Sequence, residues 1–201
     1  MDTSAHDAPA SDPAAAPPLA PEPDTGDWTW VLERRCPDCG FDADRVAATD
    51  VAAMVADTTR RWLDVLTRDD VATRPAPTVW SPLEYACHVR DVHRVYRHRL
   101  DLMLTQDDPH YPNWDQDRAA IEQRYDLAEP ATVAQELGVA GDGMAAELAD
   151  VSGGQWARTG GRSDGAAFTV DTMARYYLHD LVHHLWDVGA RDDGNLRTPR
   201  Q

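Results

Sequence analysis

Apolar residues recur at three- and four-residue spacing along most of the chain beyond residue 44, which predicts amphipathic helices. The first predicted helix covers about 44–68, and its buried stripe consists of Val51, Met54, Val55, Trp62, Val65 and Leu66. The sequence ATRPAP then ends it. A short helix is predicted at 117–125, and longer ones at 81–104, 132–150 and 169–189. No segment has the alternation of a strand, so the sequence predicts an all-α four-helix bundle.

Capping signals mark the predicted helix starts. Ser81 is a natural N-cap, and Glu84 completes a capping box with it. Thr132 with Gln135 forms a second such signal, and Thr169 caps the last helix. Three glycines are expected to weaken or kink the helix at 132–150: Gly138, Gly141 and Gly143.

The composition divides the chain into four parts. Residues 1–26 are rich in Pro, Ala and Asp and are expected to form a disordered tail, because they offer little apolar surface to bury. Residues 27–43 are apolar enough to dock as an irregular leader that carries a CxxC motif. The bundle is predicted over 44–190, followed by a flexible C-terminus at 191–201.

The charge pattern narrows the choice of partners and compartment. The chain has 35 acidic and 19 basic residues, a net charge of -16. An acidic surface without a basic stripe argues against nucleic acid and anionic membranes as partners. No apolar run approaches the roughly 20 residues of a membrane span, and the first residues lack the features of a secretory signal. With three cysteines and no disulfide framework, a cytoplasmic location is expected.

The string YYLHDLVHHLWDV provides a pair of metal-ligating side chains. His179 and His183 lie four residues apart, so on a helix both imidazoles can reach one ion. His184 is rotated by about 100° and is expected to point elsewhere. An ordinary histidine pair in the core or on the surface is the alternative.

A third histidine on the second helix strengthens the metal hypothesis. His88 has apolar neighbours, whereas His98 lies in an arginine cluster. His88, His93 and His98 follow at five-residue intervals, so at most one of them is expected to face the bundle axis, and His88 is the inward choice. One histidine from this helix and the pair from the last would leave an open coordination position, as in catalytic sites.

The segments WSPLEYACHVRD and YYLHDLVHHLWD together resemble the DinB-like superfamily of metal-binding four-helix bundles. That grouping includes mycothiol-dependent maleylpyruvate isomerases and S-transferases that use mycothiol or bacillithiol. The resemblance covers roughly 44–189 and implies that His88, His179 and His183 bind the metal. Because the isomerase branch has glutamate where this chain has His179, the resemblance favours the S-transferase branch.

The resemblance implies a divalent metal ion, with zinc as the first choice and nickel or iron as alternatives. The ion would hold a low-molecular-weight thiol as thiolate, for attack on a small electrophile or for reversible addition to a double bond. All 19 basic residues are arginine, a vocabulary typical of GC-rich bacterial genomes, which favours mycothiol. A metal-dependent hydrolase with an activated water and a non-catalytic bundle that binds metal or ligand are the alternatives.

Several other residues are weaker candidates. Glu84, Asp91 and Asp187 could accept N–H groups from metal-bound histidines, although solvated charges or ion pairs with arginine are favoured for them. Glu84 or Asp91 could also serve a hydrolase beside its water. In the glycine-rich loop before the last helix, Arg158 and Arg162 could grip an anionic substrate, unless the loop is an ordinary connector.

The cysteines leave a further question. Cys36 and Cys39 lie in CPDCG, which is half of a zinc knuckle. Two ordinary thiols in a tight turn are favoured. A redox pair, or a second metal completed by a histidine or by another subunit of a homodimer, stays open. Cys87 is expected to be a buried, inert thiol.

Overall fold

The computed structural model describes residues 26–190, and within them the predicted all-α bundle is confirmed. Its α-helices are α1 (Val51–Val65), α2 (Pro82–Thr105), α3 (Gln116–Glu122), α4 (Pro130–Asp150) and α5 (Val170–Asp187). Short 3-10 helices flank them: η1 (Thr29–Leu32), η2 (Ala43–Arg45), η3 (Ala48–Asp50), η4 (Tyr125–Leu127) and η5 (Gly153–Ala157). No helix of the described part is both long and apolar enough to cross a membrane. Most of the predicted tail and the 191–201 terminus lie outside the described residues.

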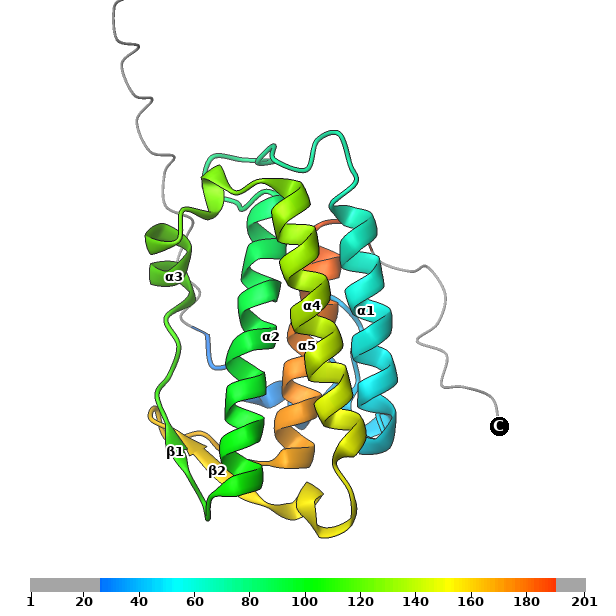
Figure 1. Cartoon of the computed structure of the whole chain (residues 1–201), viewed down its shortest axis with the longest axis vertical. Helices are drawn as coiled ribbons and strands as arrows, with labels where there is room; N and C mark the ends of the chain where they lie inside the picture. Colours follow the sequence, from blue (N-terminus) through cyan, green and yellow to red (C-terminus); the bar gives the residue numbers. More distant parts are fainter. Residues whose placement is uncertain (1–25, 191–201) are drawn as a thin grey trace, which may run out of the picture.

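The four long helices form a bundle in which chain neighbours are not always spatial neighbours. Helices α4 and α5 each pack against both α1 and α2 (Figure 1). The connection at 66–81 therefore carries the chain from α1 to α2 across the end of the bundle. The connection at 106–129, which includes α3, runs along the outside of α2 (Figure 1). As a result, α2 and α5 face each other beneath a loop-covered side of the bundle.

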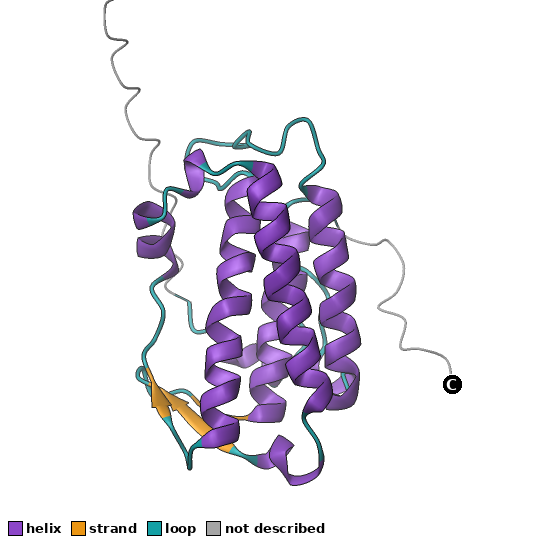
Figure 2. Ribbon diagram, viewed as in Figure 1, coloured by secondary structure: helices purple, strands orange, loops and turns teal. Residues whose placement is uncertain are grey.

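A small sheet closes one end of the bundle, where no strand was predicted (Figure 2). It has the order β1-β2-β3, with β1 parallel to β2 and β2 antiparallel to β3. The strands are β1 (His110–Tyr111), β2 (Thr159–Arg162) and β3 (Ala167–Thr169), too short to show alternation. The β2 glycines permit close packing, because a Cβ on Gly160 would lie 2.8 Å from the Met103 side chain.

Two of the three predicted helix starts are confirmed. The capping box of Ser81 and Glu84 is present, and Thr169 accepts a hydrogen bond from the Thr172 N–H. The box predicted at Thr132 is wrong, because α4 begins two residues earlier, where Pro130 occupies its first turn. Helix α1 is also shorter than predicted, since 43–50 forms the 3-10 turns η2 and η3 instead of a helical extension.

The glycines of α4 act differently from the prediction. The helix runs uninterrupted through them, and Gly141 lies where α4 crosses α1. A Cβ at Gly141 would lie 2.3 Å from Thr59 Oγ1, so the absence of a side chain allows the two helices to approach. Gly141 lowers the intrinsic helix propensity of α4, but it allows α4 to pack closely against α1.

Helix α2 is buried on more than one face, which corrects the expectation for its histidines. His88 and His93 are both fully buried, whereas His98 is exposed. The Nδ1 atom of His93 lies 2.5 Å from the Tyr177 hydroxyl, so this histidine belongs to the packed core between α2 and α5. At most one of the three was expected to face the bundle axis, yet two are buried, because α2 packs against both α4 and α5.

Candidate metal centres on helix α5

Helix α5 carries two interleaved pairs of ligand side chains in the string HDLVHH. His179 and His183 form one pair, and Asp180 and His184 form the other, each four residues apart. Consecutive helical residues are rotated by about 100°, so the two pairs occupy neighbouring faces of the helix. One face meets the leader, and the other meets α2.

On the α2 side, His88, Asp180 and His184 form a group that we call the carboxylate centre. One ligand atom from each lies within 4.8 Å of the others. Asp180 Oδ1 is 3.7 Å from His88 Nε2 and 3.0 Å from His184 Nε2. Two imidazole nitrogens and a carboxylate oxygen are a donor set that suits divalent first-row metals.

The surroundings of His88 fit a metal ligand. Both of its ring nitrogens are buried without a hydrogen-bond partner among the described residues. Burial lowers the pKa of His88, which favours the neutral imidazole that a metal needs. A buried imidazole without partners costs stability unless another group, such as an ion, satisfies it.

Negative charge gathers around His184. Burial alone would lower the pKa of His184, but Asp180 and Asp187 raise it to about 10. Burial would raise the pKa of Asp180, yet the contact with His184 and the proximity of His88 hold that pKa well below its usual range. The position thus attracts positive charge, as a cation site must.

Asp187 holds the His184 ring in place. Its Oδ2 accepts a hydrogen bond from His184 Nδ1 at 2.7 Å, so the opposite nitrogen faces Asp180. Asp187 Oδ1 also lies 3.9 Å from Nε2 of His183. Asp187 was a candidate to orient a predicted ligand such as His183, but its hydrogen bond is with His184.

On the other face of α5, Cys36, Cys39, His179 and His183 form a group that we call the cysteine centre. Their ligand atoms all lie within 4.8 Å of one another, and Cys36 Sγ is 3.7 Å from His183 Nδ1. The Nε2 atom of His179 is buried without a hydrogen-bond partner in the described part of the chain. Burial raises the pKa of the Cys39 thiol to about 12.

A cavity of about 1430 Å³ opens beside both centres. Asp180 and His184 reach it from the carboxylate centre, while His88 lies beneath the surface with the Trp114 ring stacked on it at 5.3 Å. The wall contains two arginines, Arg99 and Arg162, and seven aromatic residues: Trp28, Trp80, Tyr85, Tyr96, Trp114, Phe168 and Tyr176. The cavity therefore combines a metal-ligand floor with aromatic and cationic walls.

The family model described as the DinB superfamily matches residues 52–188. The chain belongs to the DinB superfamily. One similar solved structure is YfiT from Bacillus subtilis, described as a probable metal-dependent hydrolase with an unusual four-helix bundle topology. It has 18% identity and a TM-score of 0.60, covering 74% of this chain and 85% of that chain, so the likeness concerns the fold. No curated protein matches.

Membership of the DinB superfamily confirms the resemblance, but the predicted ligand trio is divided in this chain. His179 and His183 come together as expected, whereas His88 groups with Asp180 and His184 on the adjacent face. His184 does point away from the His179–His183 pair, as expected, but it lies with His88, which the prediction had placed beside that pair. A rotation of one residue along α5 separates the two groupings. The signal in the sequence was Asp180, which makes a second i, i+4 pair with His184.

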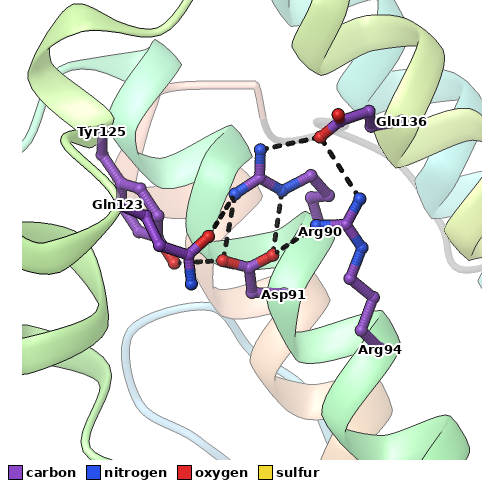
Figure 3. Close-up of polar contacts among 6 residues, drawn as sticks. All are labelled: Arg90, Asp91, Arg94, Gln123, Tyr125 and Glu136. Atoms are coloured by element: carbon purple, nitrogen blue, oxygen red, sulfur yellow. Dashed lines mark hydrogen bonds and ion pairs between the residues drawn. The ribbon is translucent and has the colours of Figure 1, made fainter.

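Two predicted carboxylates do not support the ligands. Glu84 caps α2 through the Ser81 N–H and pairs with Arg74. Asp91 lies in a buried network of Arg90, Arg94, Gln123, Tyr125 and Glu136 (Figure 3). Its partners lie on the α4 side of α2 and on the α2–α4 connection. Both carboxylates therefore have structural ion pairs, as the alternative interpretation held.

The two loop arginines have different positions. Arg162 lines the cavity, where it pairs with Asp164 and its guanidinium carbon lies 5.8 Å from the Phe168 and Tyr176 rings. Arg158 donates instead to the carbonyl oxygens of Met103 and Gln106, so it ties the loop to the end of α2. Only Arg162 is placed to meet a substrate.

Proposed function

We propose that this DinB-superfamily protein is a divalent-metal-dependent enzyme that uses a low-molecular-weight thiol for S-transfer or isomerisation at the carboxylate centre. The observation that carries the proposal is the size of the cavity beside the carboxylate centre, whose three ligands leave part of the coordination sphere of a metal ion open. The cavity volume of about 1430 Å³ exceeds the roughly 300–1,000 Å³ of most single-ligand pockets. A thiol reaction needs room for a cosubstrate and a second substrate, and hydrolysis by water does not.

The residues at the centre suit such chemistry. His88, Asp180 and His184 supply three ligands, which leaves part of the coordination sphere for a substrate. A bound divalent ion, with zinc as the first choice and nickel or iron as alternatives, would supply the positive charge that favours a thiolate. Asp180 cancels only part of that charge. Asp187 keeps the His184 ring turned toward the centre.

The cavity wall provides groups for binding polar substrates. Arg99 is buried, with its guanidinium carbon 4.8 Å from the Tyr96 ring and 5.0 Å from the Tyr111 ring. Together with Arg162 it places positive charge in the wall of a strongly acidic protein. Arginine forks bind carboxylates and other anionic groups, and the aromatic rings exclude water around them. Mycothiol is the first candidate thiol, because the use of arginine for every basic residue is typical of GC-rich bacterial genomes.

Hydrolysis by an activated water is supported less well. It requires a carboxylate or similar base beside the water, and the two residues nominated for that role were Glu84 and Asp91. Glu84 is bound to Arg74 at the start of α2, and Asp91 is bound to Arg90 and Tyr125. Both are therefore occupied away from the carboxylate centre.

The test combines binding and turnover on the metal-loaded full chain. We expect mycothiol to raise the Tm, and we expect its consumption with a chromogenic aryl halide to exceed the rate in buffer. His184→Ala should lose both effects. His98→Ala is the matched control, because His98 is an exposed histidine on α2 that lies in neither centre.

Two outcomes would overturn the proposal. Hydrolysis of ester or amide substrates without any response to thiols would identify a hydrolase. Metal uptake with no response to thiols or to any substrate would identify a non-catalytic binding protein.

A further inference from the structure

We propose that Cys36, Cys39, His179 and His183 bind a second metal ion, a zinc-type structural ion that fixes the N-terminal leader to α5. Its donors are two thiols and two imidazoles, one from each of four side chains. A set of two cysteines and two histidines is typical of tetrahedral structural zinc sites. The ion would therefore differ in role from one at the carboxylate centre.

The spacing of the ligand atoms fits one tetrahedral ion. Bonds of about 2.3 Å to sulfur and 2.0 Å to nitrogen place neighbouring ligand atoms roughly 3.3–3.8 Å apart. Cys36 Sγ and His183 Nδ1 are 3.7 Å apart, and no pair in the group exceeds 4.8 Å. Small rotations of the side chains would be enough to close the site.

The backbone of the cysteine turn is already arranged for metal binding. The Gly40 N–H donates to the Cys36 carbonyl at 3.0 Å, and Gly40 has a φ of 78°, which favours glycine. The Phe41 N–H points at Cys39 Sγ at 3.5 Å, a contact that stabilises a thiolate. A turn of this kind directs both sulfur atoms to the same side, here toward α5.

The side chains of this site are largely buried, although His179 and His183 also border the cavity. Cys36 is 1% exposed, Cys39 7% and His179 4%. The Trp28 ring covers His179 and His183, with its centroid 5.9 and 5.1 Å from theirs. Four protein ligands complete a tetrahedral sphere, so this ion has no position for a reacting molecule. The unpartnered Nε2 of His179 is the buried polar atom that such an ion would satisfy.

An ion here would join parts of the chain that are distant in sequence. Cys36 and His183 are 147 residues apart, and Phe41 of the leader belongs to the same hydrophobic core as Leu181 of α5. The leader also supplies Trp28, Thr29 and Leu32 to the wall of the cavity. Binding of the second ion would thus fix one wall of the substrate cavity in place.

The direct test is cobalt substitution of the full chain. We expect two cobalt ions per chain, with a sulfur-to-cobalt charge-transfer band in the near ultraviolet and the intense visible bands of tetrahedral cobalt. Cys36→Ser/Cys39→Ser should lose the charge-transfer band and one ion. Cys87→Ala is the matched thiol control, because Cys87 lies in neither centre, and it should keep both.

His88→Ala separates this inference from the proposed function. It should lose the other ion and keep the charge-transfer band, whatever the enzyme activity proves to be. The wild-type spectrum needs no variant, so the test does not depend on the double serine variant folding. Absence of the band from wild-type protein, or a Cys36–Cys39 disulfide in protein purified with metal, would overturn the inference.

Proteolysis measures the effect on the leader. Arg34 and Arg35 are exposed sites for trypsin in the leader, and Arg45 is another exposed site just beyond it. Stripping the metal with a chelator should increase cleavage there by roughly tenfold or more, since local opening governs such cleavage. Equal cleavage rates with and without metal would show that the leader does not depend on an ion.

Discussion

The carboxylate centre and the cysteine centre occupy neighbouring faces of the same helix, yet they are built for different purposes. The carboxylate centre has three ligands, two of which border a large cavity. The cysteine centre has four ligands, and its two thiols are buried between the leader, to which they belong, and α5. Four residues of the α5 string HDLVHH contribute ligands, two to each centre. The segment that packs against each face of α5, either α2 or the leader, thus decides which chemistry that face can support.

Asp187 connects the two centres. It lies 2.7 Å from His184 in the carboxylate centre and 3.9 Å from His183 in the cysteine centre. A single carboxylate can therefore influence both candidate metal sites, more strongly the one that it hydrogen-bonds. The comparison predicts that most ligand variants will change metal binding at one centre only, whereas a variant of Asp187 will change it at both.

The largest effect is expected from Asp180→Asn, which removes the anionic ligand of the carboxylate centre. We expect its metal affinity to fall by more than the roughly 100-fold that loss of an outer partner can cost, with turnover abolished. The charge-transfer band of the cysteine centre should remain. Metal analysis and the cobalt spectrum measure both centres in one sample.

Asp171→Asn is the control for this variant. Asp171 is another aspartate of α5, and it pairs with Arg175 at 2.9 Å. It should retain both ions. If Asp180→Asn also kept both ions and its activity, the assignment of Asp180 as a ligand would be wrong.

The next largest effect is expected from Asp91→Asn, which should lower the stability of the fold without loss of metal. Asp91→Asn breaks a buried ion pair with Arg90, in which both carboxylate oxygens accept at 2.9 and 3.0 Å. Removal of one partner from a buried ion pair destabilises a protein by about 3 kcal/mol or more. We expect a loss at the lower end of that range, because Glu136 still pairs with Arg90 in the variant. Chemical denaturation should show the loss, while metal content stays unchanged. Loss of an ion would restore Asp91 as a metal-supporting residue.

The same network predicts a dependence on pH. Burial would raise the pKa of Asp91, but hydrogen bonds from Arg90 and Tyr125 lower it below its ordinary value. Its contribution to stability is therefore present above a pH of about 4 and lost as the pH falls through the folded pKa. The stability difference between wild type and Asp91→Asn, measured on metal-free protein, should shrink in acid. A difference that stayed constant below pH 4 would contradict this assignment.

A smaller effect is expected from Asp187→Asn. The affinity of the carboxylate centre should fall by about 10- to 100-fold, because the amide orients His184 less strongly. The cysteine centre should weaken less, since Asp187 is farther from His183. Competition with a chelator measures the two affinities separately. Equal losses at both centres would show that Asp187 acts through the shape of α5 rather than through its contacts.

The sequence was sufficient to predict the bundle because its evidence is local. Apolar spacing marks the long helices, and the capping residues Ser81 and Thr169 mark two of their starts. The three strands escaped prediction, because they have two to four residues each and depend on close packing at Gly160. Short elements of this kind are fixed by tertiary contacts.

The metal ligands show where local evidence ends. Spacing predicted that the ligand atoms of His179 and His183 would lie close together, and they lie within 4.8 Å of each other. It could not decide whether that pair or Asp180 with His184 faces α2, since a 100° rotation of α5 exchanges them. Nor could it place Cys36 beside His183, because 147 residues separate them and only the docked leader brings them together.

The smallest expected effect belongs to Cys87→Ala, which tests whether sequence proximity to a ligand implies participation. Cys87 precedes His88 but points about 100° away, and it is fully buried. Burial raises the pKa of this thiol to about 12, so it remains protonated and unreactive. Removal of one buried sulfur should cost about 1 kcal/mol of stability. Both ions and the charge-transfer band should persist. Loss of metal from the carboxylate centre would show that the Cys87 thiol reaches that centre. The carboxylate centre would then also contain sulfur, and the two faces of α5 would no longer differ in this respect.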